Sequence, residues 1–190
     1  TVTLTSNSYT MAEDAGGYHT LRVELSVATY EDVTVSIDGT GGTATEGTDF
    51  GTVSDITISA GNTLGTTTFT ATDDNVYEGN ETAGISVSGV SGGGASESGS
   101  QAVTITITEN ESAPTVTLTT SATRIAENAG SSLTLTATLS GATNADVTVA
   151  LSTSGTSTEG TDYTDGSGNI DDITISAGAT TGTVSFTPTD

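Results

Sequence analysis

The sequence contains one series of short motifs twice, in the same order, and this internal repeat constrains the fold more than any other feature. TVTLT at 1–5 returns at 115–119, and GTATEGTDF at 42–50 returns as GTSTEGTDY at 155–163. AEDAGG, DVTV, DITISAG and FTATD have counterparts in the same order. A period of about 114 residues is long enough for each copy to form one small domain.

The repeat predicts two domains joined by a short linker. We expect a complete domain at residues 1–111, a linker at 112–114 and a second domain at 115–190. Pro114 ends the preceding strand and stiffens the linker. The second copy has no counterpart of residues 74–111, which hold the last two strands. We therefore expect either a window from a longer array of repeats or a domain that a neighbouring segment completes.

Short stretches in which Val, Ile or Leu alternates with Thr or Ser predict strands along the whole chain. Between them lie turns rich in Gly, Asn, Asp and Ser. Thr, Ser, Gly and Val are poor helix formers, so no stretch is expected to be helical. About seven strands in a unit of this size predict an all-β fold of tandem immunoglobulin-like antiparallel sandwiches, the second one incomplete. Beyond residues 1–5, the clearest alternating stretches are 21–27, 33–37, 56–59, 66–70, 83–87 and 102–108.

The charge balance excludes several functions. The chain has 24 Asp and Glu against 2 Arg, with no Lys and no Cys, and a formal charge of −22. Nucleic acid and anionic membranes are poor partners, because binding them requires basic residues that neutralise phosphates. No apolar run is long enough for membrane insertion. The single His19 has no nucleophile pattern around it, so we expect no enzyme, and the natural partner of the acid excess is a cation.

The densest acidic stretch is DDNVYEGNE at 73–81, with four carboxylates in nine residues. Full ionisation of such a cluster near neutral pH is unfavourable without a counter-charge, which two Arg cannot supply. A hard divalent cation can supply it. Ca²⁺ accepts many oxygen ligands in an irregular cage, whereas Mg²⁺ keeps more water. The stretch therefore predicts a Ca²⁺ site.

GTATEGTDF, DITISAG and FTATDDNVYEGNET together resemble the Calx-β domain, which occurs in sodium–calcium exchangers, integrin β4 and large bacterial surface proteins. The resemblance covers one complete and one partial copy, and it implies an immunoglobulin-like sandwich with Ca²⁺ ligands at one end. Val76 stands where the family uses a main-chain carbonyl, and Asn110 stands where it has a carboxylate, which leaves the number of ions open. By position, the implied ligands of the first copy are Glu13, Asp49, Asp73, Asp74, Val76, Glu78, Glu81, Glu109, Asn110 and Glu111. The second copy keeps Glu127, Asp162 and Asp190, which are too few for a full site.

The resemblance and the tandem copies lead to a structural hypothesis. We expect a calcium-binding repeat of a large secreted bacterial surface, adhesin or filament protein, in which Ca²⁺ rigidifies the domain junctions. Its partners would be neighbouring repeats, with a cell-surface or glycan target bound through other domains. One alternative is a calcium-sensing regulatory module attached to a transporter or enzyme. Another is an accessory module beside a catalytic domain.

Overall fold

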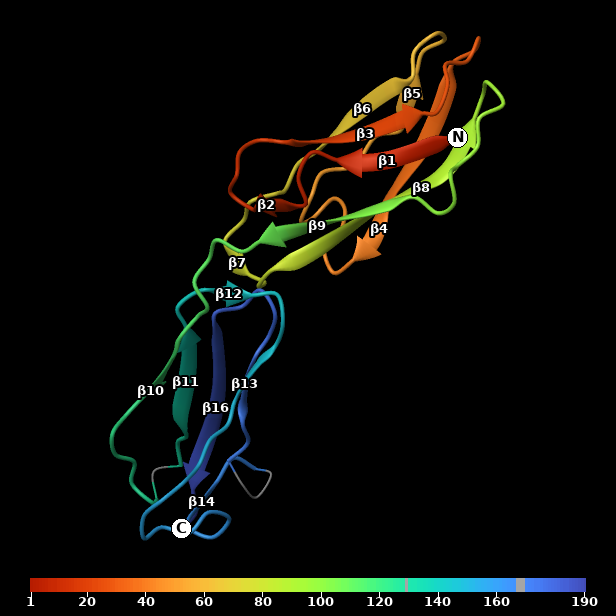
Figure 1. The fold of residues 1–190 in the computed structure, drawn as a ribbon. Coiled ribbons are helices and arrows are strands. Elements are labelled where there is room, and N and C mark those ends of the chain that lie inside the picture. The colour runs from red at the N-terminus through yellow and green to blue at the C-terminus, as the bar shows by residue number, and fades with distance from the viewer. Residues whose placement is uncertain (129, 167–169) are drawn as a thin grey trace. The chain divides into compact units, whose positions relative to one another are not determined.

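The structure is a computed structural model that describes residues 1–128, 130–166 and 170–190. The described residues form strands and no helix (Figure 1), so the expected all-β fold is confirmed. Within this described part, no helix is long and apolar enough to cross a membrane. Ala129, which belongs to the second copy of the AEDAGG motif, lies outside the described residues.

The chain divides into two compact units. The first consists of Thr1–Asp74 and Gly79–Asn110, and the second of Asn75–Glu78 and Glu111–Asp190. The repeat in the sequence places residues 75–78 in the first domain. They are grouped with the second because β7 (Val76–Tyr77) pairs in parallel with β12 (Ala142–Thr143).

Two sheets form the first unit. One has the strand order β1-β3-β6, and the other has the order β2-β9-β8-β4-β5. Each stretch predicted from alternation lies within or overlaps one of these strands. The three strands of the first sheet are β1 (Val2–Ser6), β3 (His19–Leu25) and β6 (Leu64–Phe69). The five of the second are β2 (Thr10–Ala12), β4 (Val33–Gly42), β5 (Ile56–Ile58), β8 (Glu81–Ser91) and β9 (Ala102–Thr108).

The core of the first unit lies between these sheets and is closed to solvent. Phe50 and Phe69 are fully buried, and their ring centroids lie 5.1 Å apart. Ile85 of β8 and Ile105 of β9 are also fully buried, because alternate residues of a strand point to the same face. Complete burial of one such side chain contributes about 1.5–3 kcal/mol to folding.

The second unit repeats part of this plan with the second copy of each motif. Its larger sheet has the order β10-β11-β16-β14, and a separate pair is formed by β13 and β15. The buried core cluster is smaller and consists of Ala137, Leu139, Ile173 and Ile175. The strands of the larger sheet are β10 (Val116–Thr120), β11 (Leu133–Leu139), β14 (Tyr163–Thr164) and β16 (Thr181–Pro188). The pair is β13 (Val147–Val149) and β15 (Ile173–Ile175).

Candidate metal centre

Strand register brings three carboxylates of the first unit to one end of its five-stranded sheet. β2 and β9 run parallel, and the last residue of β2 lies opposite the last residue of β9. Glu13 and Glu109 directly follow these two residues. β8 runs antiparallel to β9 and begins at Glu81, opposite Ile107 near the end of β9. The three acids therefore come together through pairing between segments far apart in the sequence.

Asp49 reaches the same place from the loop that follows β4. Its Oδ2 accepts a hydrogen bond from the amide of Thr45 at 2.6 Å, and its carbonyl oxygen accepts one from the amide of Thr72 at 2.9 Å. β4 ends at Gly42, whose φ is +94°. A Cβ there would overlap the carbonyl oxygen of Thr82, so only glycine fits the bend that leads into this loop.

The carboxylate oxygens of this cluster approach one another closely. One oxygen of Glu13 lies within 4.8 Å of one of Glu109, and the same holds for Asp49 and Glu81. Glu13 is buried, with 7% of its surface exposed, and Asp49, Glu81 and Glu109 are half-buried. We call these four residues the acidic cluster.

The acidic cluster raises the pKa of Glu81 above its ordinary value of 4.5. The largest cause is desolvation, because burial disfavours the charged carboxylate. The negative charge of Asp49 and a hydrogen bond with its side chain come next, followed by the charges of Glu13 and Glu109. In the absence of a cation, Glu81 therefore holds its proton more tightly than a carboxyl in water.

Basic side chains do not supply the missing positive charge. Arg22 pairs with Glu24 at 3.1 Å on the surface, and the chain's other Arg is Arg124, in the second unit. The donors in the acidic cluster are all oxygens, and they come from four separate segments. This donor set fits a hard divalent cation with an irregular oxygen shell, and Ca²⁺ is the cation that best matches it.

Two further residues of the predicted ligand set are brought together in the first unit. The side-chain amide of Asn110 donates a hydrogen bond to Oδ1 of Asp73 at 3.2 Å. Glu109 is held by two bonds, since its Oε2 accepts from the amide of Gly79 at 2.7 Å and its own amide donates to Oδ1 of Asn80 at 3.0 Å. Asp74 is exposed on the connection that follows Asp73.

The other predicted ligands belong to the second unit. The second unit includes Val76, Glu78 and Glu111, so these residues are not part of the acidic cluster, which was defined within the first unit. Oδ2 of Asp162 accepts a hydrogen bond from the amide of Thr158 at 2.6 Å, which repeats the geometry of the Asp49 loop. Glu127 and Asp162 line one cavity, and Asp190 is exposed.

Several acidic residues outside the predicted ligand set accept hydrogen bonds from backbone amides in the loops of each unit. Oδ1 of Asp55 accepts a hydrogen bond from the amide of Ile37 at 3.0 Å, and its counterpart Asp172 accepts one from Leu151 at 2.9 Å. Because both copies make the same bonds, these acids are structural. Similar bonds to backbone amides are made by Asp32, Glu46, Asp146 and Glu159.

The raised pKa of Glu81 predicts a pH dependence of stability in calcium-free protein. The folded state binds this proton more tightly than the unfolded state, so the contribution of Glu81 to stability falls as pH rises from about 4.5 through the raised value. Glu81→Gln removes the titrating group and should flatten this part of the profile. Urea unfolding in EDTA at several pH values between 4 and 7 measures it. Equal slopes in the parent and in Glu81→Gln would contradict the prediction, and Glu31→Gln, an exposed acid, serves as the control.

Comparison with known proteins identifies one family. The model of the Calx-beta domain family matches residues 1–111 and again 109–187. Among solved structures, the crystal structure of CBD12 from CALX1.2 is 22% identical, with a TM-score of 0.47, and the match covers 96% of this chain and 72% of that one. The crystal structure of the apo form of the Calx CBD1 domain is 23% identical, with a TM-score of 0.49, over 58% of this chain and 98% of that one. No curated protein matches the sequence.

Proposed function

Because the chain belongs to the Calx-beta domain family, in which calcium-binding domains are known, we propose that its first unit binds Ca²⁺ through the acidic cluster. Four carboxylates that meet at one end of a sandwich, in a chain with only two Arg, are the observation that carries this proposal. Glu13, Asp49, Glu81 and Glu109 would hold the ion. Bound Ca²⁺ would supply the positive charge that the cluster lacks.

The remaining residues of the predicted set are candidate ligands around this centre. Asp73 and Asn110 are hydrogen-bonded to each other, and the amide of Thr72, next to Asp73, is bonded to the carbonyl oxygen of Asp49. The resemblance to the family adds Asp74, Val76, Glu78 and Glu111. For the second unit it implies Glu127, Asp162 and Asp190, which offer fewer carboxylates, so we expect weaker binding there.

Isothermal calorimetry with Ca²⁺ tests the site directly. The 190-residue chain should bind Ca²⁺, and the double variant Asp49→Asn, Glu81→Gln should lose about tenfold or more in affinity because two charged ligands are replaced by neutral amides of nearly the same shape. Glu31→Gln removes one charge on an exposed loop and should leave the affinity unchanged. Full retention of binding in the double variant would show that other residues hold the ion.

We propose that the parent protein is a secreted bacterial surface, adhesin or filament protein in which this repeat is a structural element outside the cell. Two copies this similar favour a repeated spacer, and the near absence of basic residues suits a calcium-rich, saline exterior. The partners would be neighbouring repeats, with a surface or glycan target bound elsewhere in the parent. We expect no binding of nucleic acid, no membrane insertion and no enzymatic activity.

In this proposal Ca²⁺ also stiffens the passage from one repeat to the next. The argument comes from the sequence, because Glu109-Asn110-Glu111 leads directly to the linker at 112–114. An ion held by these residues would restrict the backbone at the junction. Small-angle scattering should show a narrower range of dimensions with Ca²⁺ than with EDTA, and identical profiles would argue against stiffening.

A further inference from the structure

The second unit leaves open an apolar face that the first unit closes. The first four residues of β1 and β10 are identical, VTLT in both, and each strand pairs with its neighbour in the same register, since Val2 lies opposite Leu25 and Val116 opposite Leu139. Yet Val2 and Leu4 are 0% and 5% exposed, whereas their counterparts Val116 and Leu118 are 43% and 50% exposed. The strands are equivalent, so the difference lies in what covers them.

In the first unit, the cover is the β8–β9 hairpin with its connection. The amide of Val2 donates to the carbonyl oxygen of Ser96 at 2.9 Å, and the amide of Leu4 donates to Oε1 of Gln101 at 3.2 Å. Three alternate residues of each strand point into the core and are 9% exposed or less. They are Ala83, Ile85 and Val87 of β8, and Val103, Ile105 and Ile107 of β9.

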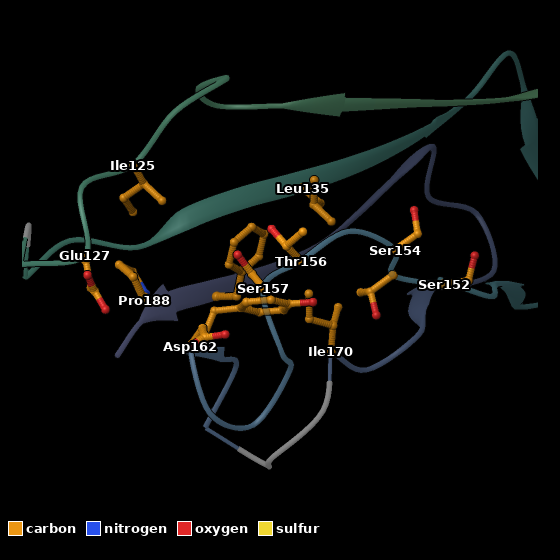
Figure 2. Close-up of a pocket in the computed structure, with 13 residues that line it drawn as sticks. Ile125, Glu127, Leu135, Ser152, Ser154, Thr156, Ser157, Asp162, Ile170 and Pro188 are labelled. Carbon is orange, nitrogen blue, oxygen red and sulfur yellow. The ribbon is translucent and has the colours of Figure 1, made fainter. Parts of the chain in front are cut away.

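In the second unit, a cavity of about 750 Å³ lies on this face. Figure 2 shows Ile125, Leu135 and Ile170 turned toward this common space. Each is half-buried, although its counterpart in the first unit, Met11, Leu21 or Val53, is buried. The aromatic pair Tyr163 and Phe186, with ring centroids 5.6 Å apart, also lines the cavity, whereas its buried counterpart is the pair Phe50 and Phe69.

The second unit also offers a strand edge beside this face. In the first unit, β4 pairs with β5 on one side and with β8 on the other. Its counterpart β13 pairs with β15, and among the described residues no strand lies on the other side. An exposed edge next to an apolar face accepts an added strand through backbone hydrogen bonds, with alternate side chains entering the core.

We propose that this face binds a β-hairpin of the kind formed by residues 82–108, supplied from outside these 190 residues, with its first strand added antiparallel to β13. The occupant has three inward aliphatic residues in each strand and Thr, Ser or Gly between them. The charge of the hairpin is compatible with binding. Residues 82–108 carry only one formal charge, on Glu97, so the acidic chain repels a hairpin of this kind only weakly. A second copy of the chain is a poorer source, because its own hairpin fills its own core.

The test uses the full 190-residue chain and a synthetic peptide of residues 82–108, titrated in EDTA. The peptide omits Glu81 and Glu109, so this result does not depend on the calcium proposal. We expect saturable 1:1 binding, with NMR shift changes at Val116, Leu118 and Val147–Val149. Amide exchange in β10 and β13 should slow by about tenfold or more as their opening becomes coupled to peptide release. The control peptide with Ile85→Asp and Ile105→Asp should bind about tenfold or more weakly, because it would bury two charges.

In the peptide titration, three results would overturn the proposal. The first two are the absence of binding and equal binding of the control peptide. The third is shift changes confined to the first unit, which would mean that the peptide replaces the β8–β9 hairpin of that unit. If the free peptide aggregates, the same sequence joined behind Asp190 through a flexible linker replaces it, and amide exchange at Val116 and Leu118 is the readout. Unchanged exchange in that chain would equally refute the proposal. Self-association of the free chain through β10 would assign the face to a second copy instead.

Discussion

Chelation of Ca²⁺ should lower the thermal unfolding midpoint of the first unit by a large margin. An ion bound only by the folded state stabilises it by RT ln(1 + [L]/Kd), which is about 2.7 kcal/mol at a hundredfold excess over Kd. For a domain of this size, each kcal/mol moves the midpoint by roughly 4–8 °C. One ion therefore corresponds to a shift of roughly 10–20 °C, and further ions add to it.

The direction of this effect follows from the acidic cluster. Without the ion, carboxylates held within 4.8 Å of each other repel, and burial raises the pKa of Glu81 further. Unfolding relieves both the repulsion between the carboxylates and the desolvation of Glu81, so the folded state is less stable without calcium than with it. Scanning calorimetry with saturating Ca²⁺ and with EDTA measures the difference.

Matched variants separate ion binding from general charge effects. Asp49→Asn with Glu81→Gln should abolish most of the Ca²⁺ response, and the variant's calcium-free midpoint should be higher than that of the parent because the repulsion is gone. Asp73→Asn with Asp74→Asn tests the acidic stretch from which the sequence argument began. Glu31→Gln should respond to Ca²⁺ as the parent does. Equal midpoints of the parent chain with Ca²⁺ and with EDTA would refute calcium binding by the fold.

Local patterns predicted most of the first unit, because its strands alternate clearly. TVTLT and AVTITIT have period-2 burial in the structure, as they do in the sequence. β2 was not predicted, because three residues are too short a stretch to show a period of two, and because its parallel pairing with β9 is a contact between distant segments. The short β7 was missed for the same reason, since its partner β12 lies in the second repeat.

The acidic cluster was predicted as a set of residues, but its arrangement was not. The sequence drew attention to residues 73–81, whereas the buried carboxylate of the cluster is Glu13, in a motif more than 50 residues earlier. Its burial follows from the pairing of β2 with β9, which no local pattern encodes. The role of Asp55 in holding the amide of Ile37 could have been found from the repeat, because Asp172 stands at the same place in the second copy.

Truncation of one aromatic residue in each unit should show how unequal the two cores are. Phe69→Ala removes a fully buried ring that packs on Phe50, and such changes cost about 3–5 kcal/mol in closed cores. Phe186→Ala is the matched change in the second unit, where the ring lines an open cavity beside Tyr163. Because water already reaches this ring, we expect its removal to cost less than half as much.

Urea unfolding followed by NMR, with resolved signals from each unit, measures the two costs separately. The comparison is made first in the free chain, where a similar loss of stability for both variants would show that the second core is closed in solution.

The comparison is then repeated with the 82–108 peptide bound. If the hairpin completes the second sandwich, Phe186 becomes buried as Phe69 is, and the cost of Phe186→Ala should rise toward that of Phe69→Ala. An unchanged cost with the peptide bound would mean that the peptide binds without closing the core.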